Sequence, residues 1–174
     1  MKTTRRLVLG FAVLGALIVA TPPAAANNWW FGGGIGLSFG DVDYISVEPV
    51  IGYNVREDVA VGGRLIYAYR SDDRVPGGFT GRDYGASVFA RWFFTKHAFL
   101  QGEYEYLSYE YPTFTGETLR DNFGSWLLGA GWSQPIGRNA SFFAMGLYNL
   151  SYRENEPSPY GSAVIIRVGV GFSF

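Results

Sequence analysis

The chain has 174 residues with fifteen acidic and fourteen basic side chains, so its formal net charge is only −1. This weak and mixed charge gives no argument for a nucleic-acid partner. The absence of cysteine excludes a disulfide framework. The 31 aromatic residues (14 Phe, 12 Tyr and 5 Trp) beside 24 Gly are typical of a β-rich chain rather than a helical one.

The first 26 residues have the pattern of a secretory signal peptide. Three basic residues precede an apolar segment over residues 7–20, and the small residues 24–26 provide a cleavage site. We expect cleavage after Ala26, which leaves a single domain over residues 27–174. The leader holds three basic and no acidic residues, so eleven basic and fifteen acidic residues remain and the mature net charge is −4.

Turn residues divide the mature chain into eight segments in which apolar residues alternate with small or polar ones. Side chains alternate across a β-strand, and each segment is near the 9–11 residues of a tilted transmembrane strand. No segment after the leader approaches the ~20 apolar residues of a transmembrane helix. The sequence therefore predicts an all-β protein, an eight-stranded antiparallel up-and-down transmembrane β-barrel. The expected strands are residues 29–39, 44–55, 59–70, 83–94, 98–109, 122–132, 140–152 and 165–174.

The last strand shows the alternation most clearly. Its even-numbered positions are all apolar, whereas Arg167 and three small residues occupy the odd positions from 167 to 173. The chain ends on Phe174, an aromatic residue inside the strand. Outer-membrane barrels end in this way, with a terminal Phe facing lipid.

The connections between the expected strands differ in length. The second, fourth and sixth are short, whereas most of the others are longer. The longer ones are residues 71–81, 111–121 and 153–159. Outer-membrane barrels have short periplasmic turns and longer external loops. We therefore expect both termini on the periplasmic side and the odd-numbered connections outside the cell.

Six charged residues in mid-strand positions indicate which face meets lipid. All six lie on the phase opposite the apolar residues: Glu48, Arg64, Arg91, Glu103, Glu105 and Arg167. A soluble secreted barrel of the lipocalin type would carry these charges outside. An Arg or Lys facing lipid at the midplane costs about 2–4 kcal/mol, and eight strands enclose only enough space for side chains. We therefore expect an interior network of ion pairs, with no charge on the apolar phase of any strand body.

Aromatic residues on the apolar phase gather toward both ends of the expected strands. Trp29, Trp92 and Trp132 lie at the ends assigned to the periplasm, and Tyr67 and Tyr84 lie toward the other ends. Two such girdles are favoured at the two interfaces of a membrane.

Pro49, within the second strand, does not follow these rules. It cannot donate a ladder hydrogen bond, and a closed barrel has no edge strand on which proline is tolerated. We expect a β-bulge or a bound water at this position.

The whole mature chain resembles the small eight-stranded outer-membrane barrels, the OmpA-like transmembrane domain and the OmpX/Ail-like group. Residues 44–53 followed by 59–63 look like their second and third strands. Phe172 and Phe174 resemble the C-terminal signal that the barrel assembly machinery reads. The resemblance implies a monomer in the outer membrane of a Gram-negative cell, with periplasmic chaperones, outer-membrane lipid and lipopolysaccharide as partners. No cell-wall tether of the longer OmpA type is expected.

The expected function is that of a non-enzymatic integral outer-membrane protein, structural or adhesin-like. The three longer loops named above would carry an extracellular ligand, although ordinary solvated loops explain their charges more simply. No metal-ligand spacing, cofactor motif or phosphate-cradling loop is present.

The two alternative functions are a lipid-modifying enzyme and a narrow pore. Lipid A deacylases of similar architecture use a His-x-Ser pair. Here the sole histidine, His97, lies in a tight periplasmic turn with no serine two residues on, and a serine nucleophile needs a base within about 2.6–3.2 Å. A narrow pore would need an open interior, which the expected side chains fill.

Overall fold

The computed structural model describes residues 28–38, 42–72, 78–112, 118–153 and 158–173. The predicted signal peptide over residues 1–26, Phe174 of the predicted assembly signal and parts of the predicted loops 71–81, 111–121 and 153–159 lie outside these described residues. Among the described residues, no helix is long and apolar enough to cross a membrane.

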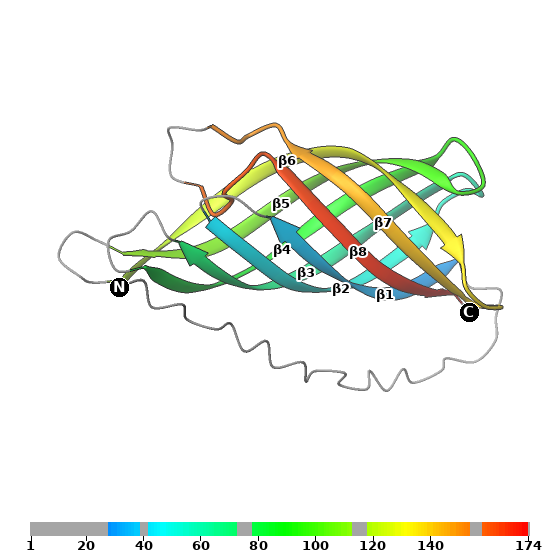
Figure 1. Ribbon diagram of the computed structural model, residues 1–174. Coiled ribbons are helices and arrows are strands. Elements are labelled where there is room, and N and C mark those ends of the chain that lie inside the picture. Colours follow the sequence, from blue (N-terminus) through cyan, green and yellow to red (C-terminus); the bar gives the residue numbers. More distant parts are fainter. Residues whose placement is uncertain (1–27, 39–41, 73–77, 113–117, 154–157, 174) are drawn as a thin grey trace, which may run out of the picture.

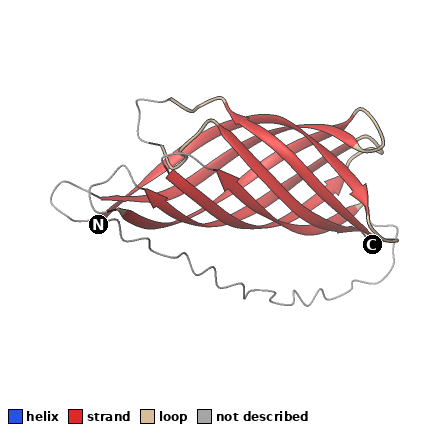
Figure 2. Ribbon diagram, in the orientation of Figure 1, coloured by secondary structure: helices blue, strands red, loops and turns tan. Residues whose placement is uncertain are grey.

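Eight antiparallel strands close into a barrel in sequence order (Figures 1 and 2). Each strand pairs with its neighbours in the chain, and β8 returns to pair with β1. The sheet therefore has no exposed edge. The predicted all-β, eight-stranded up-and-down barrel is confirmed. The strands are β1 (Trp29–Ser38), β2 (Val42–Asn54), β3 (Val59–Asp72), β4 (Phe79–Phe93), β5 (Ala98–Pro112), β6 (Thr118–Pro135), β7 (Ala140–Asn149) and β8 (Val164–Ser173).

The barrel is apolar outside and polar inside. On the exterior, Val47, Leu65 and Val88 are each more than 60% exposed. The six charged residues predicted to face the interior are all buried, with at most 5% exposure. Because a strand has a period of two, this alternation fixes which face of every strand points inward. The predicted phase is confirmed, and the lipocalin-like arrangement is excluded.

We call the end of the barrel that carries the odd-numbered connections the loop end, and the opposite end the turn end. Several strands are longer than predicted at the loop end. Cross-strand pairing continues out to Asp72 and Phe79 on one hairpin, and to Pro112 and Thr118 on the next. The predicted loops 71–81 and 111–121 are therefore too long. Glycine, proline and charged residues made these segments look like loops, but pairing between the strands overrides their local preference. In contrast, β7 ends at Asn149 rather than at residue 152.

The longer strands place charged residues on the exterior phase, beyond the tyrosine girdle. Arg82, Glu110 and Arg120 lie side by side across β4, β5 and β6. The Arg120 guanidinium is 2.5 Å from the Glu110 carboxylate, and it lies 4.3 Å from the centre of the Tyr84 ring. The prediction that no charge lies on the apolar phase holds for the shorter expected strands and is wrong for the full ones.

Pro49 does not form the expected bulge. The β2–β3 register is the same on both sides of it, with Val47 opposite Tyr67 and Val50 opposite Arg64. The ladder to β3 is interrupted at Glu48 and Pro49, whereas pairing with β1 continues through Gly33. A local gap in one ladder therefore accommodates the missing N–H without an extra residue, and the alternative of a bound water stays a prediction.

Candidate functional site: an interior ion-pair cluster and a cavity at the turn end

Interior positions of four strands bring five of the six predicted charged residues together. Glu48 comes from β2, Arg64 from β3, Glu103 and Glu105 from β5, and Arg167 from β8. Gly36 of β1 leaves the space for this central cluster, because a Cβ there would lie 2.3 Å from the Glu48 Oε1 atom.

Arg167 is the centre of the cluster and contacts all three carboxylates. Its Nε lies 3.0 Å from Glu48, its Nη1 lies 2.9 Å from Glu103 and its Nη2 lies 2.6 Å from Glu105. Arg64 Nη1 contacts Glu48 at 3.2 Å and Glu103 at 3.3 Å. Every one of these side chains is at most 1% exposed. Such charge-assisted hydrogen bonds are stronger than neutral ones. The burial of all five side chains indicates that the cluster fills the middle of the barrel.

A tyrosine from the β7–β8 connection covers the cluster on the loop side. The Tyr160 hydroxyl donates to Glu105, and its ring packs 5.0 Å from that of Tyr44. Both tyrosines are at most 1% exposed. Burial, followed by the Glu105 carboxylate, raises the pKa of Tyr160 well above its ordinary range, so this phenol stays protonated. Tyr160 is not predicted from the sequence, because a residue in a connection has no strand period to place it.

Arg91 departs from the expected network of carboxylate partners. Its Nε and Nη2 atoms both donate to Gln101 Oε1, at 2.9 and 2.8 Å. Gln101 in turn donates to Glu103 at 2.8 Å. The Arg91 guanidinium also lies among four aromatic rings, the nearest of which is Phe99 at 4.1 Å. Arg91 is thus joined to the central cluster through a neutral amide.

A second buried ion pair, outside the six predicted interior charges, lies toward the loop end. Arg70 Nε is 3.0 Å from the Asp83 carboxylate, and both side chains are at most 2% exposed. Arg70 also donates to the backbone carbonyl of Glu110. Both residues occupy the interior phase at the ends of the expected strands 59–70 and 83–94, so the alternation alone was enough to identify them.

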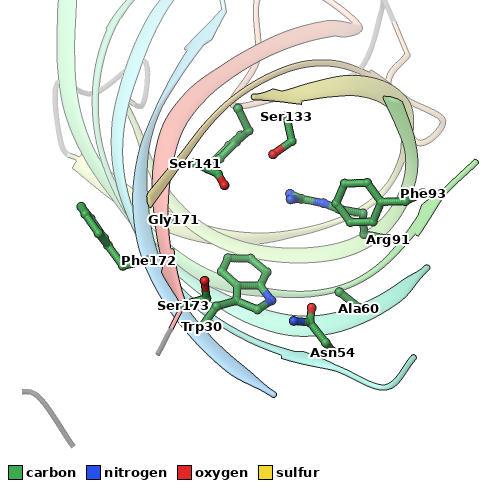
Figure 3. A pocket seen from close by; sticks show the side chains of 11 residues that line it. Trp30, Asn54, Ala60, Arg91, Phe93, Ser133, Ser141, Gly171, Phe172 and Ser173 are labelled. Carbon is green, nitrogen blue, oxygen red and sulfur yellow. The ribbon is translucent and has the colours of Figure 1, made fainter. Parts of the chain in front are cut away.

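At the turn end of the barrel, a cavity of about 150 Å³ opens inside the wall (Figure 3). Arg91 points into it, opposite Ser133 and Ser141. We call this space the mouth cavity. Its lining residues are Trp30, Asn54, Ala60, Arg91, Phe93, Ser133, Ser141, Phe143, Gly171, Phe172 and Ser173.

His97 lies outside the barrel interior, in the turn after β4. Its Nδ1 atom is 2.9 Å from the backbone oxygen of Ser133, and its ring stacks on Trp132 with the centroids 5.1 Å apart. In the described part of the chain, no serine hydroxyl bonds to this ring and no three His, Cys, Asp or Glu side chains form a group that would hold a metal ion.

No protein-family model and no curated protein sequence matches the chain. Among solved structures, the chain is similar to the N-terminal β-barrel domain of Pseudomonas aeruginosa OprF. The similarity covers 86% of this chain and all of that domain, with a TM-score of 0.53 and 17% sequence identity. A NanC porin structure is matched over 84% of this chain and all of that one, with a TM-score of 0.36 and 15% identity. The likeness to OprF shows that the chain has the fold of a small, OmpA-like eight-stranded barrel, as predicted.

Proposed function

We propose that the chain is a non-enzymatic integral protein of the Gram-negative outer membrane, with a structural or surface-interaction role. The inverted polarity of the barrel carries this proposal. Leu65 and Val88 are exposed on the exterior, whereas Arg167 is buried among three carboxylates in the interior. A closed barrel pairs the backbone groups of its strands with one another and has no open edge, as hydrocarbon requires of a spanning structure.

Two aromatic girdles support the membrane placement. Trp92 and Trp132 lie on the exterior near the turn end, while Tyr67, Tyr84 and Tyr148 lie on it near the loop end, all about half exposed. Aromatic residues are enriched at both interfaces of membrane barrels. The charged row of Arg82 and Arg120 lies outward of Tyr84, where a headgroup layer rather than hydrocarbon would surround it.

The partners of the proposed protein follow from this placement. They are outer-membrane lipid and lipopolysaccharide, together with the chaperones and assembly machinery that deliver a barrel exported by its signal peptide. A surface ligand would bind the external loops. Within the predicted loop 153–159, Ser158 and Pro159 are buried, as is the adjacent Tyr160. These three buried residues are therefore not available to a surface ligand.

The proposal is tested by expressing the full chain in a Gram-negative host and separating the two membranes. We expect the protein in the outer membrane, beginning at Asn27, with a folded form whose gel mobility changes on boiling. Leu65→Arg places a cation on the exterior near the middle of β3 and should lower stability in lipid by about 2–4 kcal/mol. Recovery of a folded, water-soluble protein, or unchanged stability of Leu65→Arg, would refute the membrane placement.

The central cluster should block the passage of ions through the barrel. Because Arg167, Arg64 and their carboxylate partners fill the middle of the barrel, we expect no steady conductance of porin size across a planar bilayer. The control is Arg56→Gln, which alters an exposed ion pair outside the lumen and should leave the conductance the same as that of the native protein. Steady porin-sized openings of the native protein would favour the alternative of a pore.

A further inference from the structure

Arg91 has more hydrogen-bond donors than the described residues satisfy. A guanidinium carries five N–H donors in a fixed fork. Two of its nitrogens, Nε and Nη2, share the single acceptor Gln101 Oε1. In the part of the chain that the structure describes, no other acceptor bonds to this guanidinium, and no carboxylate forms an ion pair with it. The outer edge of the fork, at Nη1, is therefore left to the mouth cavity.

Aromatic rings surround the Arg91 guanidinium and stabilise its charge without accepting a hydrogen bond from the Nη1 edge. The rings of Phe99 and Phe143 lie 4.1 and 5.3 Å from the guanidinium carbon, and those of Trp30 and Phe89 both lie 5.6 Å away. Aromatic faces attract a cation, but they offer no oxygen acceptor in the plane of the fork. Since arginine is not deprotonated in proteins, the site keeps a buried positive charge, with Arg91 only 5% exposed.

The central cluster balances this charge from a distance. It holds three carboxylates and two guanidinium groups, so it has one carboxylate in excess. Gln101 separates Arg91 from the nearest of them, Glu103, by donating to it while accepting from Arg91. The excess carboxylate lowers the affinity of Arg91 for another anion, but it does not occupy the edge that faces the mouth cavity.

Among the described residues, the lining of the mouth cavity has hydroxyl and amide groups and no acidic side chain. Asn54, Ser133, Ser141 and Ser173 contribute its other polar groups, and Figure 3 shows Ser133 and Ser141 across from the guanidinium. A cavity of about 150 Å³ engineered into another protein binds benzene, so a volume of this size accepts a small molecule. Planar carboxylates and tetrahedral phosphates match the arginine fork.

The mouth cavity is reached from the turn end of the barrel. It shares Asn54, Phe93, Ser133 and Ser141 with a wider cavity of about 610 Å³. Arg56, Glu57 and Lys96 line that outer space, so charges of both signs lie along the entrance.

We propose that the mouth cavity binds one small oxyanion of the phosphate, sulfate or carboxylate class, between the free edge of Arg91 and the hydroxyls of Ser133 and Ser141. This site is separate from the central cluster, and it faces the turn end, on the periplasmic side of the proposed outer-membrane orientation. Its occupation does not depend on that orientation, so the binding test below and the localisation test above can fail independently.

The test uses the full mature barrel refolded in detergent without phosphate, titrated with inorganic phosphate and separately with acetate at constant ionic strength. Calorimetry or ³¹P NMR should show saturable binding at one site. We expect Arg91→Gln to weaken binding at least tenfold and Ser133→Ala with Ser141→Ala to weaken it severalfold. Arg56→Gln, which changes the entrance but not the mouth cavity, should bind as the native protein does.

Two results would overturn the proposal. The first is the absence of saturable binding to a protein that is folded by circular dichroism and gel mobility. The second is equal affinity in Arg91→Gln and the native protein. If Arg91→Gln does not fold, the double serine variant decides the matter, because it keeps the charge and the aromatic rings; unchanged affinity in that variant excludes the site.

Discussion

Replacing Arg167 with methionine should lower the free energy of unfolding of the barrel by about 3–5 kcal/mol, the usual effect of breaking a buried ion pair from one side. Arg167 contacts Glu48, Glu103 and Glu105, and its removal leaves all three carboxylates buried with fewer cations. Methionine keeps much of the apolar side chain, so the change reports the lost charge rather than a large cavity. Urea unfolding of the refolded barrel in detergent or lipid measures it.

The structure also identifies the carboxylate that should be coupled most strongly to Arg167. Glu48 and Glu103 keep Arg64 as a partner, whereas Glu105 contacts Arg167 at 2.6 Å and otherwise bonds to the Tyr160 hydroxyl. Arg167→Met combined with Glu105→Gln should therefore destabilise the barrel by clearly less than the two single effects added.

The matched control for this cycle is Arg56→Met, which removes an ion pair with Asp58 that is exposed on both sides. Exposed pairs contribute about 0–1 kcal/mol, so this variant should unfold almost as the native protein does. Simple additivity of Arg167→Met with the Gln variants of all three carboxylates would show that the charges are hydrated independently rather than paired.

The alternation of apolar and polar residues was enough to predict which side chains enter the lumen, but not which of them meet. A period of two fixes the face of a strand and leaves its height relative to other strands undetermined. Glu103, Glu105 and Arg167 could therefore be placed inside, while their contacts depend on the stagger of β5 against β8. Because the alternation does not give these contacts, the sequence predicts a carboxylate partner for Arg91. In the structure the partner of Arg91 is the neutral side chain of Gln101.

The ends of the strands were the least predictable part of the fold. The segment around Arg120 and Asp121 has charges where a strand in lipid should be apolar, so its local sequence indicates a loop. In the structure, Arg120 satisfies its guanidinium on Glu110 and on backbone oxygens of β4 and β5. Contacts between strands thus stabilise a continuation that the local sequence does not favour.

The interior glycines pose a different question, which a pair of neighbouring positions on β6 and β7 can answer. Gly129 lies on the interior phase, opposite Leu147 in the ladder. A Cβ at Gly129 would lie 2.0 Å from the carbonyl oxygen of Gly146 and 2.8 Å from the Leu147 Cα. These are backbone atoms, so β7 itself would have to move. At Gly146, on the exterior phase, an added Cβ meets nothing within 4 Å.

Gly129→Ala should therefore lower the free energy of unfolding by about 1–3 kcal/mol, the usual effect of overpacking, and should reduce the yield of folded barrel. Gly146→Ala adds the same methyl group one register step away and should change stability by no more than about 0.5 kcal/mol, as exposed substitutions usually do. Urea unfolding of both variants in the same lipid makes the comparison. If the two substitutions had equal effects, glycine at position 129 would not be required by the close approach of β6 and β7, and intrinsic strand propensity would explain both results.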